Sequence, residues 1–243
     1  ILPPKVKLAE LKRPLNLKTL SLDWLKGDKT LLNEILTSHS LKKVDLRENR
    51  MSENYTSQFI EVLPKIGSQL KSLNLEVTTH PLYNISLIVD SCLDLEELNI
   101  RGKLSEDAMS YLCGNLTSKI LKLDFSNWTR SLNDNNIRVL VKRCPKLTVL
   151  DICSNEKVTY QGLVAIIEGL HFLEYLGVPD SIGNELGLPK MAALGLPENI
   201  DLIKMGRLKS MKNLKKMLIG NSHIPFINES ITDVNCSGLF SLF

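Results

Sequence analysis

One short apolar pattern recurs along most of the chain, with leucine or a similar residue at its first, fourth and sixth positions. Successive copies begin 24 to 29 residues apart. A unit of this length cannot bury its apolar side alone, so neighbouring units must stack to build a common core. The copies are Leu17/Leu20/Leu22, Leu41/Val44/Leu46, Leu70/Leu73/Leu75, Leu95/Leu98/Ile100, Ile120/Leu123/Phe125, Leu147/Leu150/Ile152 and Leu173/Leu176/Val178.

The spacing inside one copy indicates a strand followed by a turn. Leu150 and Ile152 are two residues apart, so a strand directs both of them inward, and Asp151 and Cys153 then face outward. Asn155 follows at the position where an asparagine turns the chain and bonds backbone groups that the short strand leaves unpaired.

A helix is predicted after this turn. Thr159 is a suitable N-cap residue, and Leu163, Ile166 and Ile167 follow at helical spacing. Each unit is therefore strand, turn and helix. The predicted fold is an α/β leucine-rich-repeat solenoid, or horseshoe, with a parallel concave sheet and convex helices.

The repeat extends over nearly the whole chain, so we expect residues 1–243 to form a single domain of about eight to nine repeats. The pattern loses its regularity after Val178, and residues 179–243 are expected to hold two irregular units that cap the core. Their motifs are Met191/Leu194/Leu196 and Leu214/Met217/Ile219.

The cysteines fall into two groups by their place in the repeat. Cys92 and Cys144 each lie three residues ahead of a motif leucine, Leu95 and Leu147. Because they share a phase of the repeat, they are predicted to be buried spacers rather than metal ligands or nucleophiles. Cys153 differs, since its predicted outward direction could leave a free thiol on the concave face.

Stacked parallel strands align their outward residues into columns. One column is polar and partly acidic: Ser21, Asp45, Asn74, Asn99, Asp124, Asp151, Gly177. The next alternates in charge over part of its length: Asp23, Arg47, Glu76, Arg101, Ser126, Cys153, Pro179. Two interpretations stay open and are compatible, namely solvated pairing along the sheet and a mixed-charge docking surface.

The candidate binding site is the place where polar and aromatic residues converge on neighbouring strands and their exits. Trp128 and Arg130 belong to the types that dominate binding energy at protein interfaces. Trp128 could instead pack over the irregular turn before Leu132. The candidate partner-binding residues are Asn99, Arg101, Asp124, Ser126, Trp128, Arg130, Asp151 and Tyr175.

Composition argues against several classes of partner and location. The net charge of +3 gives no overall field toward nucleic acid or an anionic membrane, and no apolar run is long enough to span a bilayer. The five cysteines form no paired cluster, which favours a reducing compartment, cytoplasmic or nuclear. Six glycosylation sequons point the other way, to an extracellular recognition protein: Asn54, Asn84, Asn115, Asn127, Asn228 and Asn235.

An enzyme is not expected. The four histidines are scattered, and the chain has no zinc-protease, nucleophile-elbow, P-loop or dinucleotide motif. We therefore expect no catalytic residues, no metal and no cofactor.

Residues 118–178 resemble the S-phase kinase-associated F-box proteins. Leu-Val-Lys-Arg-Cys-Pro-Lys-Leu at 140–147 follows Trp-Thr-Arg-Ser-Leu at 128–132, where that family has Leu-Val-Arg-Arg-Cys-Pro-Asn-Leu after Tyr-Arg-Lys-Asn-Leu. Val-Asn-Cys-Ser at 234–237 is similar to the Ile-Asn-Cys-Ser with which the family leaves its last repeat. The Val-Thr-x-x-Gly-Leu turn at 158–163 also resembles the cysteine-containing repeats of F-box proteins.

This resemblance implies a substrate-recognition subunit of an SCF-type ubiquitin ligase, holding a cell-cycle regulator on its concave surface. The protein substrate would be phosphorylated and held with help from an accessory protein that binds a cyclin-dependent kinase. The ligase adaptor and cullin would be reached only through an F-box, which we expect to be absent from this chain because nothing before Leu17 is long enough. The alternative is a leucine-rich-repeat scaffold or assembly factor unrelated to ubiquitin.

Three positions depart from the family's binding residues. Gly102 stands where the family has a concave tryptophan, Ser154 where it has an aspartate, and Asp180 where it has an arginine. Because losing an arginine and gaining an aspartate weakens a phosphate site, these departures put binding of the accessory protein and the phosphopeptide in doubt.

Overall fold

A computed structural model describes residues 18–21, 40–46, 54–80, 82–126, 131–185, 210–219 and 222–225. Its nine strands form one sheet in which the spatial order equals the chain order. Neighbouring strands from β1 to β8 are all parallel, and β9 pairs antiparallel with β8. The strands are β1 Thr19–Ser21, β2 Lys43–Leu46, β3 Ser72–His80, β4 Glu97–Leu104, β5 Lys122–Asp124, β6 Val149–Asp151, β7 Tyr175–Val178, β8 Lys216–Ile219 and β9 Ser222–Pro225.

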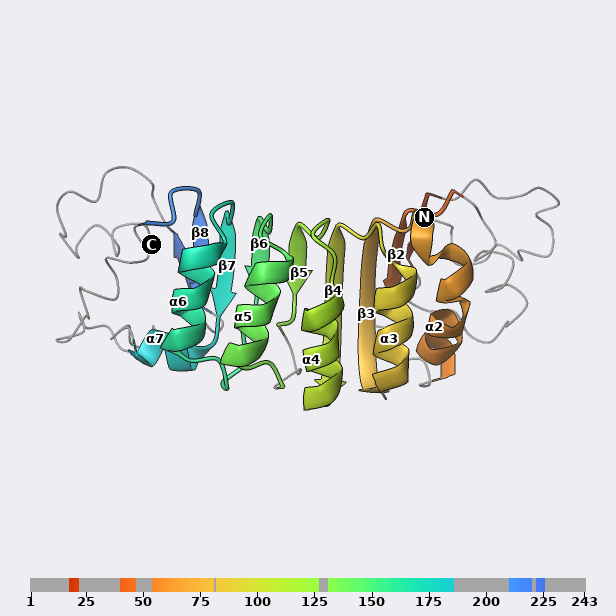
Figure 1. Ribbon diagram of the computed structural model, residues 1–243, viewed down its shortest axis with the longest axis horizontal. Coiled ribbons are helices and arrows are strands. Elements are labelled where there is room, and N and C mark those ends of the chain that lie inside the picture. Colours follow the sequence, from red (N-terminus) through yellow and green to blue (C-terminus); the bar gives the residue numbers. More distant parts are fainter. Residues whose placement is uncertain are drawn as a thin grey trace.

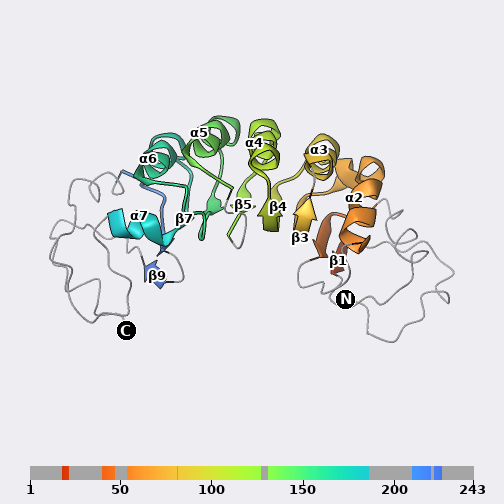
Figure 2. The same cartoon turned by 90° about the horizontal axis from the view of Figure 1, so that it is seen from below.

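The described helices lie in a row on one side of the sheet (Figure 1). Seen end-on, the row forms the outer layer of an arc and the strands form the inner layer (Figure 2). This is the predicted leucine-rich-repeat horseshoe. The helices are α2 Asn54–Ile66, α3 Leu82–Ser91, α4 Glu106–Asn115, α5 Asp134–Arg143, α6 Tyr160–Gly169 and α7 Asp180–Glu185, with a short 3-10 turn, η2 Gly67–Gln69, after α2.

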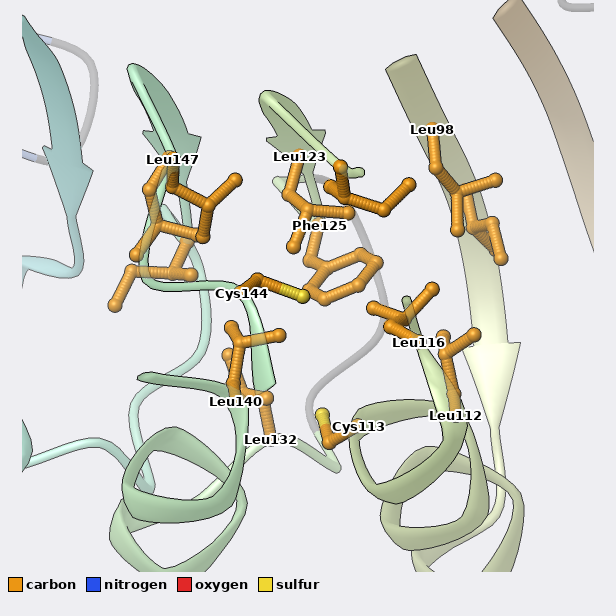
Figure 3. Packing of buried hydrophobic residues seen from close by; sticks show 14 of the residues in the cluster. Leu98, Leu112, Cys113, Leu116, Leu123, Phe125, Leu132, Leu140, Cys144 and Leu147 are labelled. Carbon is orange, nitrogen blue, oxygen red and sulfur yellow. The ribbon is translucent and has the colours of Figure 1, made fainter. Parts of the chain in front are cut away.

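The motif residues form the interior as the repeat predicts. The register places the fourth motif position of each strand opposite its counterpart on the next strand. These residues are all buried: Val44, Leu73, Leu98, Leu123, Leu150, Leu176 and Met217. Figure 3 shows how this layer meets the buried faces of α4 and α5, with Phe125 between the strands and the helices. The core is therefore continuous from repeat to repeat, and burial of apolar area is its main source of stability.

The turn after β6 confirms the predicted role of Asn155. This side chain is 0% exposed, and its Nδ2 donates to the carbonyl oxygens of Phe125 at 2.9 Å, Ile152 at 3.0 Å and Cys153 at 3.2 Å. One amide thus joins two repeats and satisfies backbone acceptors that the short strands leave unpaired. Thr159 is the N-cap of α6, as predicted, and its side chain accepts a hydrogen bond from the Gln161 backbone N–H.

The predicted burial of the spacer cysteines is confirmed for Cys92 and Cys144. The prediction for Cys153 was wrong: its side chain is 6% exposed, and its Sγ donates to the Val178 carbonyl oxygen at 3.4 Å. Cys153 is not a member of the apolar core, and the Asp151 and Asp124 carboxylates act on its thiol, so the thiol is covered by neighbouring residues beyond the end of β6.

The last described strands differ from the regular repeats. β7 pairs directly with β8, the strand that carries Met217 and Ile219 of the Leu214/Met217/Ile219 motif. The Met191/Leu194/Leu196 motif lies outside the described residues, and no strand intervenes between β7 and β8 in the sheet. Within the described part of the chain, no helix has both the length and the apolar character needed to cross a membrane.

Candidate functional site on the concave face

The sheet leaves one of its faces without helices. Parallel sheets are usually covered on both faces, but here every described helix belongs to the convex layer (Figure 2). The side chains that alternate with the buried motif residues therefore stand on an open concave face. This face positions all of the described candidate residues.

The first predicted column is confirmed strand by strand. The Cα register pairs Ser21 with Asp45, and each later member with its neighbour on the next strand. The full column is Ser21, Asp45, Asn74, Asn99, Asp124, Asp151, Gly177, with Leu218 of β8 as its next member.

Amides and carboxylates in this column bind one another. Asn74 Nδ2 donates to Asp45 Oδ2 at 3.0 Å, and Asn99 Nδ2 donates to Asp124 Oδ2 at 2.7 Å. Both bonds cross between adjacent strands, so they support the sheet as well as the surface. Asp45 and Asn74 were missing from the predicted site, although their place in the same column was a signal for including them.

Asp124 and Asp151 also fix the backbone where their strands end. Asp124 Oδ1 accepts from the backbone N–H of Ser126 at 2.9 Å and from its hydroxyl, and Asp151 Oδ1 accepts from the backbone N–H of Cys153 at 3.1 Å. Tyr175 completes the group, because its hydroxyl donates to Asp151 Oδ2 at 3.1 Å. The structure thus brings Asn99, Asp124 and Ser126 into one cluster and Asp151 with Tyr175 into the next.

Gly177 leaves the space that the Asp151 side chain occupies. A β-carbon built on Gly177 would collide with the Asp151 carboxylate. The absence of a side chain at this point of the column therefore allows the carboxylate to lie across β7, within reach of the Tyr175 hydroxyl.

Burial and negative charge both act on Tyr175. Burial raises the pKa of its hydroxyl, and the Asp151 carboxylate raises it further through charge and through the hydrogen bond. The same two causes raise the pKa of the Cys153 thiol, with Asp124 and Asp180 adding to the effect. This part of the concave face consequently has a negative potential and favours cations over anions.

The second predicted column is confirmed for one step only, because the register pairs Glu76 with Arg101. Asp23 and Arg47 lie outside the described residues, and Cys153 and Pro179 are buried beyond the ends of their strands. Arg101 is half-buried, and its Nε has no hydrogen-bond partner. Of the eight candidate residues, Trp128 and Arg130 lie outside the described part of the chain, so their place relative to the cluster stays a prediction.

Ion pairs lie on the side of the sheet where the strands begin. Lys122 Nζ lies 2.5 Å from Glu97 Oε1, and Lys71 Nζ lies 3.0 Å from Glu96 Oε1. The Lys122 ammonium holds the pKa of Glu97 below its usual range. Since these pairs are largely solvated, each adds little stability. They do neutralise this margin, which leaves Asp124 and Asp151 as the charges that distinguish the centre of the face.

Two of the three positions that depart from the F-box family have unusual backbone conformations. Gly102 has φ 118° and Ser154 has φ 65°, both in the region that favours glycine. A tryptophan at the position of Gly102 would be strained, so the backbone differs locally from one that presents a large concave side chain there. Asp180 is the first residue of α7 and places a carboxylate at the position of the family's arginine.

No group of three histidine, cysteine, aspartate or glutamate side chains within the described ranges has a geometry suited to a metal ion. The arrangement offers hydrogen-bond acceptors, an aromatic hydroxyl and negative charge on an open surface. Such a set suits the binding of another macromolecule rather than the enclosure of a small substrate.

Several solved structures are similar to this chain. The chain is similar to the leucine-rich repeat-containing protein LegL7 from Legionella pneumophila, with 13% sequence identity and a TM-score of 0.46. The match covers 98% of this chain and 94% of that chain. No family model and no curated protein matches the sequence. The assignment of the fold therefore rests on the sequence repeat and on the sheet described above.

Proposed function

We propose that this chain is a non-catalytic protein-binding module whose concave face holds a protein partner. The observation that carries the proposal is the one-sided parallel sheet. Its open face displays an ordered polar column, with cross-strand bonds from Asn74 to Asp45 and from Asn99 to Asp124. A surface whose side chains are already ordered loses less conformational entropy when a partner binds.

More specifically, we propose a substrate-recognition module of an SCF-type ubiquitin ligase that binds a cell-cycle regulator. The resemblance of residues 118–178 and 234–237 to the S-phase kinase-associated F-box proteins supports this role. The module would do no chemistry itself. It would raise the effective concentration of substrate lysines near the ubiquitin-loaded enzyme of the same assembly.

We do not extend the phosphopeptide binding of that family to this chain. Asp180 stands in the place of the arginine, and Asp151 with its neighbours makes the adjacent surface negative. A phosphorylated segment would be repelled from this end of the concave face. The proposed role therefore keeps the protein partner and the ligase but does not include the phosphopeptide or the accessory protein.

Arginine substitutions at two valines, one on each side of the molecule, test whether the concave face binds the partner. Val149 is half-buried on β6 of the concave face, and Val139 is 42% exposed on α5 of the convex layer. Val149→Arg should abolish co-purification of the partners from cell extract, whereas Val139→Arg should leave their yield unchanged. Equal yields from the two variants would show that the partners bind elsewhere.

Mass spectrometry of the same material tests the ligase assignment. The native full-length product should co-purify with the adaptor and cullin subunits of the ligase. If these subunits are missing while other partners bind, the chain is a recognition scaffold unconnected with ubiquitin.

One observation favours an extracellular version of that scaffold. Asn115, the acceptor of an Asn-Leu-Thr sequon, is exposed at the end of α4. Treatment of native material with a glycosidase would remove a glycan at this position and increase electrophoretic mobility. Unchanged mobility, with an unmodified Asn115 peptide in the mass spectrum, would eliminate this version.

A further inference from the structure

Two aspartates on the concave face are direct neighbours on adjacent strands. Asp124 of β5 and Asp151 of β6 are Cα partners in the register, so about 4.8 Å separates their backbones. Both residues are half-buried. Their carboxylates turn apart, toward Asn99 of β4 and toward Tyr175 of β7, which lowers but does not remove the repulsion between like charges on neighbouring strands.

The donors bound to these carboxylates are all neutral. Asp124 accepts from Asn99 and Ser126, and Asp151 accepts from Cys153 and Tyr175. Amide and hydroxyl groups orient a carboxylate but do not cancel its charge. Within the described ranges, neither Asp124 nor Asp151 forms an ion pair with a lysine or arginine.

Asn99 gives a second, independent indication of an incomplete site. Its side chain is only 7% exposed, and its amide lies against Asp124 through the 2.7 Å bond from Nδ2. The Oδ1 atom of the same amide is buried and has no donor. Buried acceptors are usually bonded, and one without a partner costs about 1 to 3 kcal/mol. The cluster therefore lacks a hydrogen-bond donor as well as a positive charge.

We propose that Asn99, Asp124, Asp151 and Tyr175, here called the carboxylate strip, bind an arginine- or lysine-bearing segment of the protein partner. The inference rests on the proposed function, because the partner must occupy the concave face. A guanidinium supplies both missing features, since it carries a positive charge and five N–H donors in a planar fork that matches carboxylates.

The net charge of the whole protein indicates that any binding of a basic segment must be local. The formal net charge is +3, so the long-range field does not attract a basic peptide. Binding of a cationic probe would have to arise from a local group of carboxylates. The carboxylate strip provides two on neighbouring strands. The carboxylate of Asp180, the first residue of α7, also acts on the nearby Cys153 thiol.

Fluorescence anisotropy with a labelled ten-residue peptide of alternating arginine and glycine tests the inference. We expect the wild-type chain to bind this peptide and to ignore the same peptide with glutamate in place of arginine. The double variant Asp124→Asn/Asp151→Asn should weaken binding about tenfold or more. Glu168→Gln is the matched control, because Glu168 is an exposed carboxylate on α6 of the convex layer, and it should change affinity less than about twofold.

Several outcomes would overturn the proposal. These are no binding to the wild type, stronger binding of the glutamate peptide, or an equal loss of affinity in the control and the double variant. Thermal stabilisation by millimolar Mg²⁺ or Ca²⁺ that requires Asp124 and Asp151, without peptide binding, would show a cation site instead.

A second measurement removes the dependence on a folded double variant. A lysine version of the peptide can be joined to nearby carboxylates of the wild-type chain with a carbodiimide. Mass spectrometry should then locate the crosslinks at Asp124 or Asp151. Crosslinks confined to convex carboxylates such as Glu168 would contradict the carboxylate strip as the binding site.

The two levels of the proposal can fail separately. If Val149→Arg removes the cellular partners while Asp124→Asn/Asp151→Asn retains them in full yield, the concave face binds protein and the inference of a basic segment is wrong. If Val149→Arg retains them, the proposed use of the concave face is itself wrong.

Discussion

Neighbouring residues of a strand contribute to opposite faces of the sheet, and the two faces differ in the residue types that they contain. In β6, Leu150 is 0% exposed and joins a column of aliphatic side chains, whereas Asp151 joins a column of amides, carboxylates and a glycine. The inner column is chemically uniform because each member has the same task of filling the space between sheet and helices. The column that contains Asp151, here called the outer column, runs from Ser21 to Gly177 on the concave face. Its residue type varies from strand to strand, and this variation allows it to carry binding specificity.

Two asparagines show the same contrast within one residue type. Asn155 lies in the turn between repeats and bonds three carbonyl oxygens, while Asn99 on the open face bonds one carboxylate and leaves its Oδ1 without a donor. A buried amide that is fully bonded stabilises the fold. The Asn99 amide is buried and only half bonded, so it contributes less to the stability of the fold.

The largest expected effect is on the inner column. Leu150→Ala should lower the free energy of unfolding by about 2 to 5 kcal/mol, because it removes buried methyl groups and leaves a cavity between two repeats. Val149→Ala, on the concave face of the same strand, should cost less than about 1 kcal/mol. Chemical denaturation of both variants measures the difference, and similar losses would mean that the two faces are equally packed.

The difference in unfolding free energy between alanine variants of the two asparagines should be nearly as large. Asn155→Ala removes a side-chain donor that three buried carbonyl oxygens share, so we expect a loss of about 3 kcal/mol in the free energy of unfolding. Asn99→Ala removes one cross-strand bond and one unsatisfied acceptor, and should cost about 1 kcal/mol or less. Urea titrations followed by circular dichroism would compare them, and a greater loss for Asn99 would reverse the interpretation of the two amides.

Alanine substitutions at two glycines test the packing of the outer column, with smaller expected changes in stability. Gly177→Ala forces a methyl group against the Asp151 carboxylate and should destabilise the chain by about 1 to 3 kcal/mol. Gly114→Ala meets no atom within 4 Å and lies in α4, so it should stabilise the chain by about 0.5 to 1 kcal/mol. Adding Asp151→Ala to Gly177→Ala should recover part of the loss; no recovery would show that the strain lies elsewhere.

The buried spacer cysteines, Cys92 and Cys144, also predict a modest dependence of stability on pH. Burial raises the pKa of Cys92 and of Cys144 from 9.0 to about 12. The folded chain therefore keeps protons that the unfolded chain loses, so stability is full below pH 9 and declines as pH rises toward 12. The expected loss is about 0.4 kcal/mol per thiol at pH 9. Denaturation between pH 7 and 10 should show a shallower decline for Cys92→Ala/Cys144→Ala, and identical slopes would contradict the buried thiols.

The sequence predicted most of the fold because periodicity and burial are linked in a repeat. The spacing of Leu123, Leu150 and Leu176 is sufficient to align the strands, and that alignment also fixes the outer column from Ser21 to Gly177. The phase of Cys92 and Cys144 placed them inside. Each of these predictions uses only the repeat and the alternation of side chains along a strand.

The errors begin where a strand ends. The burial of Cys153 could not be predicted, because it depends on the chain beyond the end of β6, where its Sγ bonds to the Val178 carbonyl oxygen. The unmet acceptor of Asn99 and the neutral donors around Asp151 were equally beyond the sequence, since they depend on the rotation of individual side chains. A column can be predicted from residue order, whereas its hydrogen bonds need coordinates.

The reversal of β9 has an evolutionary consequence. Seven successive strand pairs are parallel, so a duplicated repeat inserted among β1 to β8 would find a compatible neighbour on each side. β9 runs in the opposite direction against β8 and occupies the position that the next parallel strand would need. A lineage descended from this chain can therefore lengthen its horseshoe by duplication inside the array, while the antiparallel strand acts as a stop against growth beyond it.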